Sequence, residues 1–152
     1  MAQFDRLAPR VANSTAFGSV ATNASATLGA FCAPVACEVV GARVVNSSGA
    51  AITSGTTTGS AVTITVYKSA SNASSKIASF NGSGTTVATN TSQAMTLTTT
   101  TSLKRLAAGD VVLVEYLAGV ANNASNANAY VSLEYVVGYE DGSTPSAGTG
   151  PA

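Results

Sequence analysis

Two stretches of this sequence alternate between apolar and polar residues, and this alternation constrains the fold more than any other feature. In Ala61–Lys68, the side chains of Val62, Ile64 and Val66 fall on one face of an extended chain. The stretch Ala129–Val137 repeats the pattern. A period of two residues is typical of a β-strand with one buried face, as found in antiparallel sheets. We therefore expect strands that bury one face in a shared core.

Further strand-like segments lie between turns rich in Gly, Asn and Ser, at roughly the 8–12-residue spacing of sandwiches and barrels. No segment carries an apolar stripe long enough for a core helix; Ser102–Gly109 predicts at most a helical turn ended by Gly109. The pair Asn81-Gly82 predicts a hairpin turn. We expect an all-β fold, an antiparallel and jelly-roll-like β-sandwich of about eight strands, at residues 26–31, 37–45, 61–68, 76–80, 85–89, 93–101, 110–117 and 129–137.

The sequence predicts one domain with extensions at both ends. Residues 1–17 are expected to form an N-terminal arm, because Pro9 interrupts any helix there, and residues 18–140 form the sandwich. Residues 141–152 are of low complexity and predict a short flexible tail. Charges near the start interrupt the apolar run of a secretion signal, so we expect synthesis in a cytoplasm. No run reaches the ~18 apolar residues that span a bilayer, and no membrane partner is expected.

The composition argues against several kinds of chemistry. The 152 residues include seven basic and seven acidic residues and no His, and charged residues make up only 9%. Zero net charge provides no basic footprint for nucleic acid. Catalytic Ser–His and Cys–His pairs are excluded in their usual form, and ligands for a structural zinc are too few. We expect no enzyme activity, no cofactor and no metal site, and a charge-poor surface suited to contact with other proteins.

Two pairs of residues have more than one interpretation. Cys32 and Cys37 flank a short segment with a proline, and are either small buried side chains, a disulfide or a redox pair. Glu115 and Glu134 lie in strongly predicted strands and are interpreted as solvent- or interface-facing charges. A glycosidase would instead need two carboxyls about 5–10 Å apart in a cleft. The step Gly109-Asp110 predicts a tight turn in which Gly takes a positive φ and Asp hydrogen-bonds the backbone.

Three features follow one another along the chain. An apolar segment with a proline, Ala30–Val45, precedes the Thr-rich strand Val62–Tyr67. Then comes Leu-Ala-Ala-Gly-Asp and a Val-rich strand, Leu106–Tyr116, before a last long strand that ends in Tyr135–Gly138. In this order the chain resembles the jelly-roll proteins of tailed-bacteriophage heads known as capsid decoration or cement proteins. The resemblance covers about residues 18–140.

This resemblance implies a structural virion protein. Its expected state is a homotrimer at threefold and quasi-threefold positions on the outside of the head, where it clamps neighbouring subunits of the major capsid protein. It would be made in the host cytoplasm and reside on the capsid surface. Many copies on one particle give avidity, so weak single contacts suffice. The expected capsid contact is the arm, through Phe4, Arg6, Leu7 and Arg10.

Two alternatives have different sequence signatures. A trimeric receptor- or glycan-binding module of a phage tail or fibre would use loops such as Ser47–Ser60 and Ala118–Asn128. A carbohydrate-active β-sandwich enzyme would act through Glu115 or Glu134. Glycan binding favours the first alternative, and a hydrolytic activity lost on alanine substitution of either carboxylate favours the second.

Overall fold

The computed structural model describes residues 8–18, 20, 24–47, 51–52, 62–69, 73–118 and 129–138. Within these residues the chain forms ten strands, one short α-helix and one 3-10 turn. The strands are β1 (Arg10–Asn13), β2 (Ser25–Cys32), β3 (Cys37–Asn46), β4 (Thr63–Lys68), β5 (Lys76–Asn81), β6 (Thr91–Ala94), β7 (Thr96–Leu97), β8 (Arg105–Leu106), β9 (Val111–Leu117) and β10 (Ala129–Val137). The 3-10 turn η1 spans Ala73–Ser75 and the helix α1 spans Thr101–Lys104.

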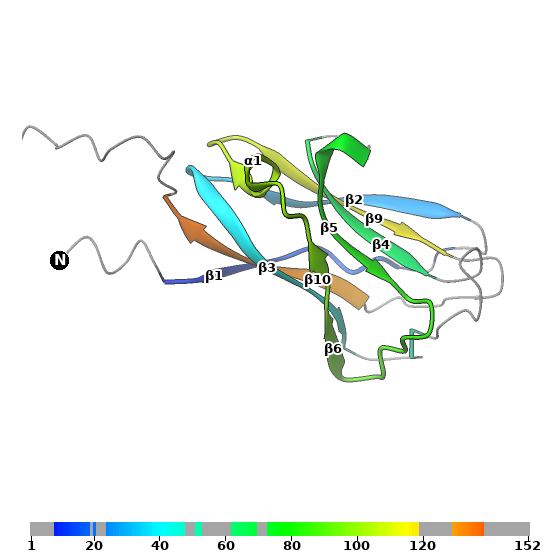
Figure 1. Ribbon diagram of the computed structural model, residues 1–152. Coiled ribbons are helices and arrows are strands. Elements are labelled where there is room, and N and C mark those ends of the chain that lie inside the picture. Colours follow the sequence, from blue (N-terminus) through cyan, green and yellow to red (C-terminus); the bar gives the residue numbers. More distant parts are fainter. Residues whose placement is uncertain are drawn as a thin grey trace, which may run out of the picture.

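The strands form two antiparallel sheets that face each other (Figure 1). The first sheet has the order β1-β10-β3-β6, and β8 also pairs with β3. The second sheet has the order β2-β9-β4-β5-β7. The predicted antiparallel β-sandwich is confirmed. Ten strands replace the expected eight, because β1 and β8 form where no strand was predicted and the segment at residues 93–101 gives two strands. The strand expected at residues 85–89 was wrong, since only an isolated bridge from Val87 to Ile52 forms there.

The alternating residues form the core as predicted. Ile64 and Val66 of β4 are fully buried, as are Val131 and Leu133 of β10. Two aromatic pairs connect the sheets: the rings of Phe17 and Tyr116 lie 5.0 Å apart, and those of Phe31 and Tyr135 lie 4.8 Å apart. Burial of such side chains supplies the main favourable free energy of folding.

One predicted strand, at residues 93–101, is divided between the two sheets. β6 pairs with β3 in the first sheet, whereas β7 pairs with β5 in the second. Buried Met95 is the residue between them, and its N–H donates to the Ala42 carbonyl over 2.9 Å. The strand therefore crosses from one sheet to the other and connects them on this side. After β7 the chain turns into α1, so the expected strand ends earlier than predicted.

Two predicted turns were wrong in detail. Asn81-Gly82 is not a hairpin between neighbouring strands, because β5 lies in the second sheet and β6 in the first. The left-handed residue in this turn is Gly84, at φ +70°, and the Asn81 side chain accepts a hydrogen bond from the Ser83 N–H. α1 ends five residues before Gly109, because Arg105 already begins β8.

The sandwich begins earlier than the expected boundary at residue 18. β1 pairs with β10 from Arg10 onward, inside the predicted arm. The N–H groups of Ser14 and Phe17 then donate to carbonyls of β10, and Phe17 is buried in the core. Only the residues before β1 can therefore act as a free arm. Of the expected arm and tail, residues 1–7 and 141–152 lie outside the described residues. No helix among the described residues is long and apolar enough to cross a membrane.

Replacement of Leu133 by Ala tests the core. Leu133 is fully buried in the central strand of the first sheet, so the substitution removes apolar contacts and leaves a cavity. We expect a loss of about 2–5 kcal/mol in the free energy of unfolding, measured by urea denaturation. Val11→Ala is the matched control, because Val11 is 59% exposed on the same sheet; equal losses for the two variants would contradict the assignment of the core.

Candidate functional site

The structure describes one of the four expected capsid-contact residues. Phe4, Arg6 and Leu7 lie outside the described residues. Arg10 is exposed and is the first residue of β1, opposite Tyr135 of β10. Since β1 ends the first sheet on this side, the expected contact segment leads directly into an open sheet edge.

A charge cluster, made of Glu38, Lys68, Lys104, Arg105 and Asp110, lies at one end of the sandwich. Lys68 ends β4 and Asp110 precedes β9, and the antiparallel pairing of these two strands brings the two side chains together. The Lys68 Nζ lies 3.1 Å from the Asp110 carboxylate and donates to the Arg105 carbonyl over 2.7 Å. Lys68 thereby connects β4 with the segment that runs from β8 to the start of β9.

The second half of the charge cluster is centred on Glu38. This residue is the second of β3 and stands directly opposite Arg105 in the pairing of β3 with β8. Its carboxylate lies 3.5 Å from the Lys104 Nζ and 3.6 Å from the Arg105 Nε. Opposite charges on facing strand positions stabilise a sheet modestly, by roughly 0.2–1 kcal/mol each.

Asp110 also closes the turn before β9, as the sequence predicted. Its carboxylate accepts a hydrogen bond from the Ala107 N–H over 2.8 Å, and Gly109 adopts φ +89°. Partial burial raises the pKa of Asp110, but the Ala107 hydrogen bond and the Lys68 ammonium outweigh this, so the pKa lies below its ordinary value of 3.8. The folded state thus favours the ionised carboxylate.

The two cysteines are both free thiols and occupy different environments. Cys37 is fully buried, and this burial, followed by the nearby Asp110 charge, raises the pKa of its thiol. A raised pKa lowers the fraction of reactive thiolate. Cys32 is exposed, with its Sγ 3.9 Å from the Gly109 carbonyl oxygen. The buried apolar interpretation therefore holds for Cys37 and was wrong for Cys32.

Glu115 and Glu134 lie on opposite outer faces of the sandwich. Glu115 belongs to β9 of the second sheet, and its carboxylate accepts a hydrogen bond from the Tyr67 hydroxyl over 3.0 Å. Burial and this carboxylate raise the pKa of Tyr67. Glu134 belongs to β10 of the first sheet and lies over Gly41, where an added Cβ would meet its Oε2 at 2.9 Å. Two carboxyls on opposite faces do not form the pair that a glycosidase needs.

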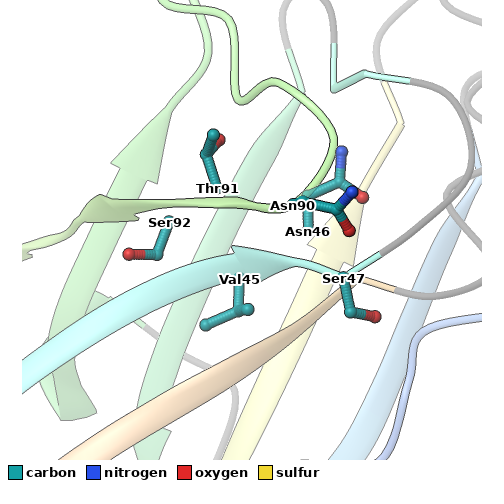
Figure 2. A pocket seen from close by; sticks show the side chains of 6 residues that line it. All are labelled: Val45, Asn46, Ser47, Asn90, Thr91 and Ser92. Atoms are coloured by element: carbon teal, nitrogen blue, oxygen red, sulfur yellow. The ribbon is translucent and has the colours of Figure 1, made fainter.

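A neutral hollow of about 440 Å³ lies at the opposite end of β3 from the charge cluster (Figure 2). We call it the β3–β6 hollow; it is lined by Val45, Asn46, Ser47, Asn90, Thr91 and Ser92. Asn46 is fully buried and its Nδ2 donates to the Val87 carbonyl over 3.2 Å. Asn90 holds the turn into β6 in a left-handed conformation at φ 60°. The described lining residues offer amides and hydroxyls and include no charged group.

Sequence reasoning missed both the charge cluster and the β3–β6 hollow. The charge cluster joins residues from positions 38 to 110, so no local sequence motif predicts it. The Gly109-Asp110 turn was the one part of it that the sequence singled out. The described residues contain no group of three or more His, Cys, Asp or Glu side chains placed to hold a metal ion. Comparison with known proteins found no matching family model, no matching curated protein and no matching solved structure.

Asp110→Asn tests the electrostatic role of the charge cluster. The depressed pKa means that the ionised carboxylate stabilises the fold above the pKa of the unfolded chain, and that this stabilisation is lost as the pH falls through the lower folded pKa. We expect the variant to be less stable by about 1 kcal/mol near neutral pH and equal to wild type in strong acid, by urea denaturation over a pH series.

Glu134→Gln is the control, since it removes the same charge from a site outside the charge cluster. A difference between wild type and Asp110→Asn that stays constant down to strong acid would contradict an ionic origin.

Proposed function

We propose that this chain is a structural protein that binds the outside of a bacteriophage head as a homotrimer and holds neighbouring subunits of the major capsid protein together. The observation that carries the proposal is that half of the described charged side chains pair within the protein, while several large apolar side chains stay exposed. In the charge cluster, Lys68 pairs with Asp110, and Glu38 pairs with Lys104 and Arg105. The bond from the Lys68 Nζ to the Arg105 carbonyl links the two groups. The large apolar side chains that remain exposed are Val11, Val35, Val40, Val111 and Leu117.

This arrangement favours contact with another protein. A charged group that enters an interface must lose its hydration, and the loss costs free energy unless a partner replaces the water. Because five charged side chains already pair within the charge cluster, the rest of the described surface carries few charges that a covering partner would have to desolvate. Interface cores are depleted in charge for the same reason.

The start of the chain is the proposed capsid contact. Exposed Arg10 and Val11 lie on β1 at the open edge of the first sheet. The nine residues before β1, which include Phe4, Arg6 and Leu7, are long enough to reach about 30 Å when extended. Apolar and guanidinium groups in this segment can contact a capsid subunit while the sandwich remains outside it.

Deletion of residues 2–9 tests this contact. We expect the truncated chain to lose binding to purified, expanded heads of the virus that encodes it, whereas the full chain binds saturably with three chains at each threefold position. Co-sedimentation with quantified bands measures the effect. The deletion stops at residue 9 because a longer one removes β1 and disturbs its pairing with β10.

Two controls make the result specific. The truncated chain should keep the unfolding midpoint of the full chain, and Lys76→Ala, an exposed residue on β5, should bind heads normally. Normal head binding by the truncated chain would contradict the contact, and failure of the full chain to bind heads would contradict the function.

A second candidate function has an observation of its own. The β3–β6 hollow presents amides and hydroxyls without charge, and it includes Ser47, where one of the predicted glycan-binding loops begins. A neutral polar hollow of this size suits part of a saccharide, whose hydroxyls pair with such groups. This hollow favours the receptor- or glycan-binding alternative.

Asn90→Gly tests that alternative. Glycine tolerates the positive φ at this position, so the variant removes the amide without straining the turn. If the chain is a glycan-binding module, wild type binds one class of glycan on an array and the variant loses at least about tenfold in affinity with an unchanged unfolding midpoint. A wild-type chain that binds no glycan removes this candidate.

A further inference from the structure

The two sides of the sandwich are built differently. On one side the chain crosses between the sheets at Met95, so β6 and β7 form a continuous connection. On the other side the sheets end in β1 and β2, which come close to each other without pairing. Among the described residues, β2 has a strand partner on one side only, which is β9.

The edge formed by β2 is long and carries no charge. β2 has eight residues, Ser-Ala-Thr-Leu-Gly-Ala-Phe-Cys, with no charged residue and no proline. By contrast, β1 has four residues and includes Arg10. Natural edge strands are usually short, charged or interrupted, because an open edge pairs with other chains. A β-bulge between Gly29 and Phe31 interrupts β2 late, which leaves Ser25–Gly29 as regular strand.

The backbone of this regular segment has a defined direction. The Ala118 N–H donates to the Ala24 carbonyl over 3.0 Å, so Ala24 directs its carbonyl toward the neighbouring strand. Because the direction alternates along a strand, Ser25, Thr27 and Gly29 direct their N–H and C=O groups toward the open edge. Their side-chain positions are exposed on the outer face, and an added Cβ on Gly29 would meet no heavy atom within 4 Å.

We propose that a second copy of this chain binds here, with the two β2 strands antiparallel across a twofold axis at Thr27. Thr27 then faces Thr27 of the second copy, and Ser25 faces Gly29 of the second copy. Each facing pair exchanges two backbone hydrogen bonds, so the outward groups of both strands are satisfied together. The two five-stranded second sheets become one continuous sheet.

The side chains around the joint fit a second copy. Ser25 pairs with Leu117 of β9, and Gly29 pairs with Leu113. In the proposed register, small Ser25 faces small Gly29 of the second copy, so no bulky side chain obstructs the approach of the two strands at the joint.

Electrostatics does not oppose this pairing. Two identical strands that carry charge would place like charges opposite each other, but β2 has none. The nearest carboxylate in the central row is Glu115, which pairs with Thr27. The two Glu115 residues would stand three strand spacings apart, roughly 14 Å, where solvent and salt screen them. The proposal does not rest on head binding; in a trimeric protein the pairing joins two trimers.

A cysteine cross-link tests the geometry. In a Cys32→Ala background, Thr27→Cys places two thiols opposite each other on the axis, within the Cα separation that a disulfide needs. We expect mild oxidation to yield a covalent species of twice 14.9 kDa on a non-reducing gel, reversible by dithiothreitol. Ser92→Cys in the same background is the control, since Ser92 is exposed on β6 at the opposite edge. No cross-link at position 27, or an equal one at position 92, would overturn the proposal.

Native mass spectrometry of uncrosslinked protein gives a second measurement. We expect wild type to show species with an even number of chains, two or six, and Thr27→Lys to weaken this association by at least about tenfold, because two ammonium groups would face each other. Thr27→Ser should keep the even-numbered species. Their absence from wild type, or their persistence in Thr27→Lys, would also overturn the proposal, whether or not the chain binds heads.

Discussion

The burial of one face of each long strand between two sheets is the constraint on which the rest of the structure depends. Ile64, Val66, Val114 and Leu133 fill this interior, and charged residues are left to the ends and outer faces. Because only one face of each strand is used for the core, the opposite face is available for other contacts. In this chain that opposite face is composed mainly of small neutral residues, with few charges to desolvate.

The arrangement of charge follows from strand pairing. Antiparallel pairing brings the start of β3, the end of β4 and the start of β9 to one end of the sandwich, where Glu38, Lys68 and Asp110 meet their partners. The opposite end of β3 carries the neutral β3–β6 hollow. The side with the Met95 crossing is connected by the chain itself, whereas on the side with β1 and β2 the described residues provide no further strand partner. Both proposed contacts, with a capsid and with a second copy, use this open side.

Local patterns predicted the long strands well, because alternation and turn residues act within a few positions. They failed where distant segments decide the outcome. Residues 93–101 alternate like one strand, yet the two halves pair with β3 and β5, which the sequence does not bring together locally. Arg10–Asn13 lacks an alternating pattern and becomes a strand because β10 offers it an edge. Of the candidate contact residues only Arg10 is described, and the charge cluster had no signal beyond Gly109-Asp110.

The central claim is that this sandwich is bound to the outside of a virus head, and electron cryomicroscopy of heads incubated with the purified chain tests it most directly. The account predicts added density at the threefold and quasi-threefold positions into which three copies of the sandwich fit, with the β1 side toward the capsid. Heads with no added density at these positions, or density confined to the tail, would contradict it.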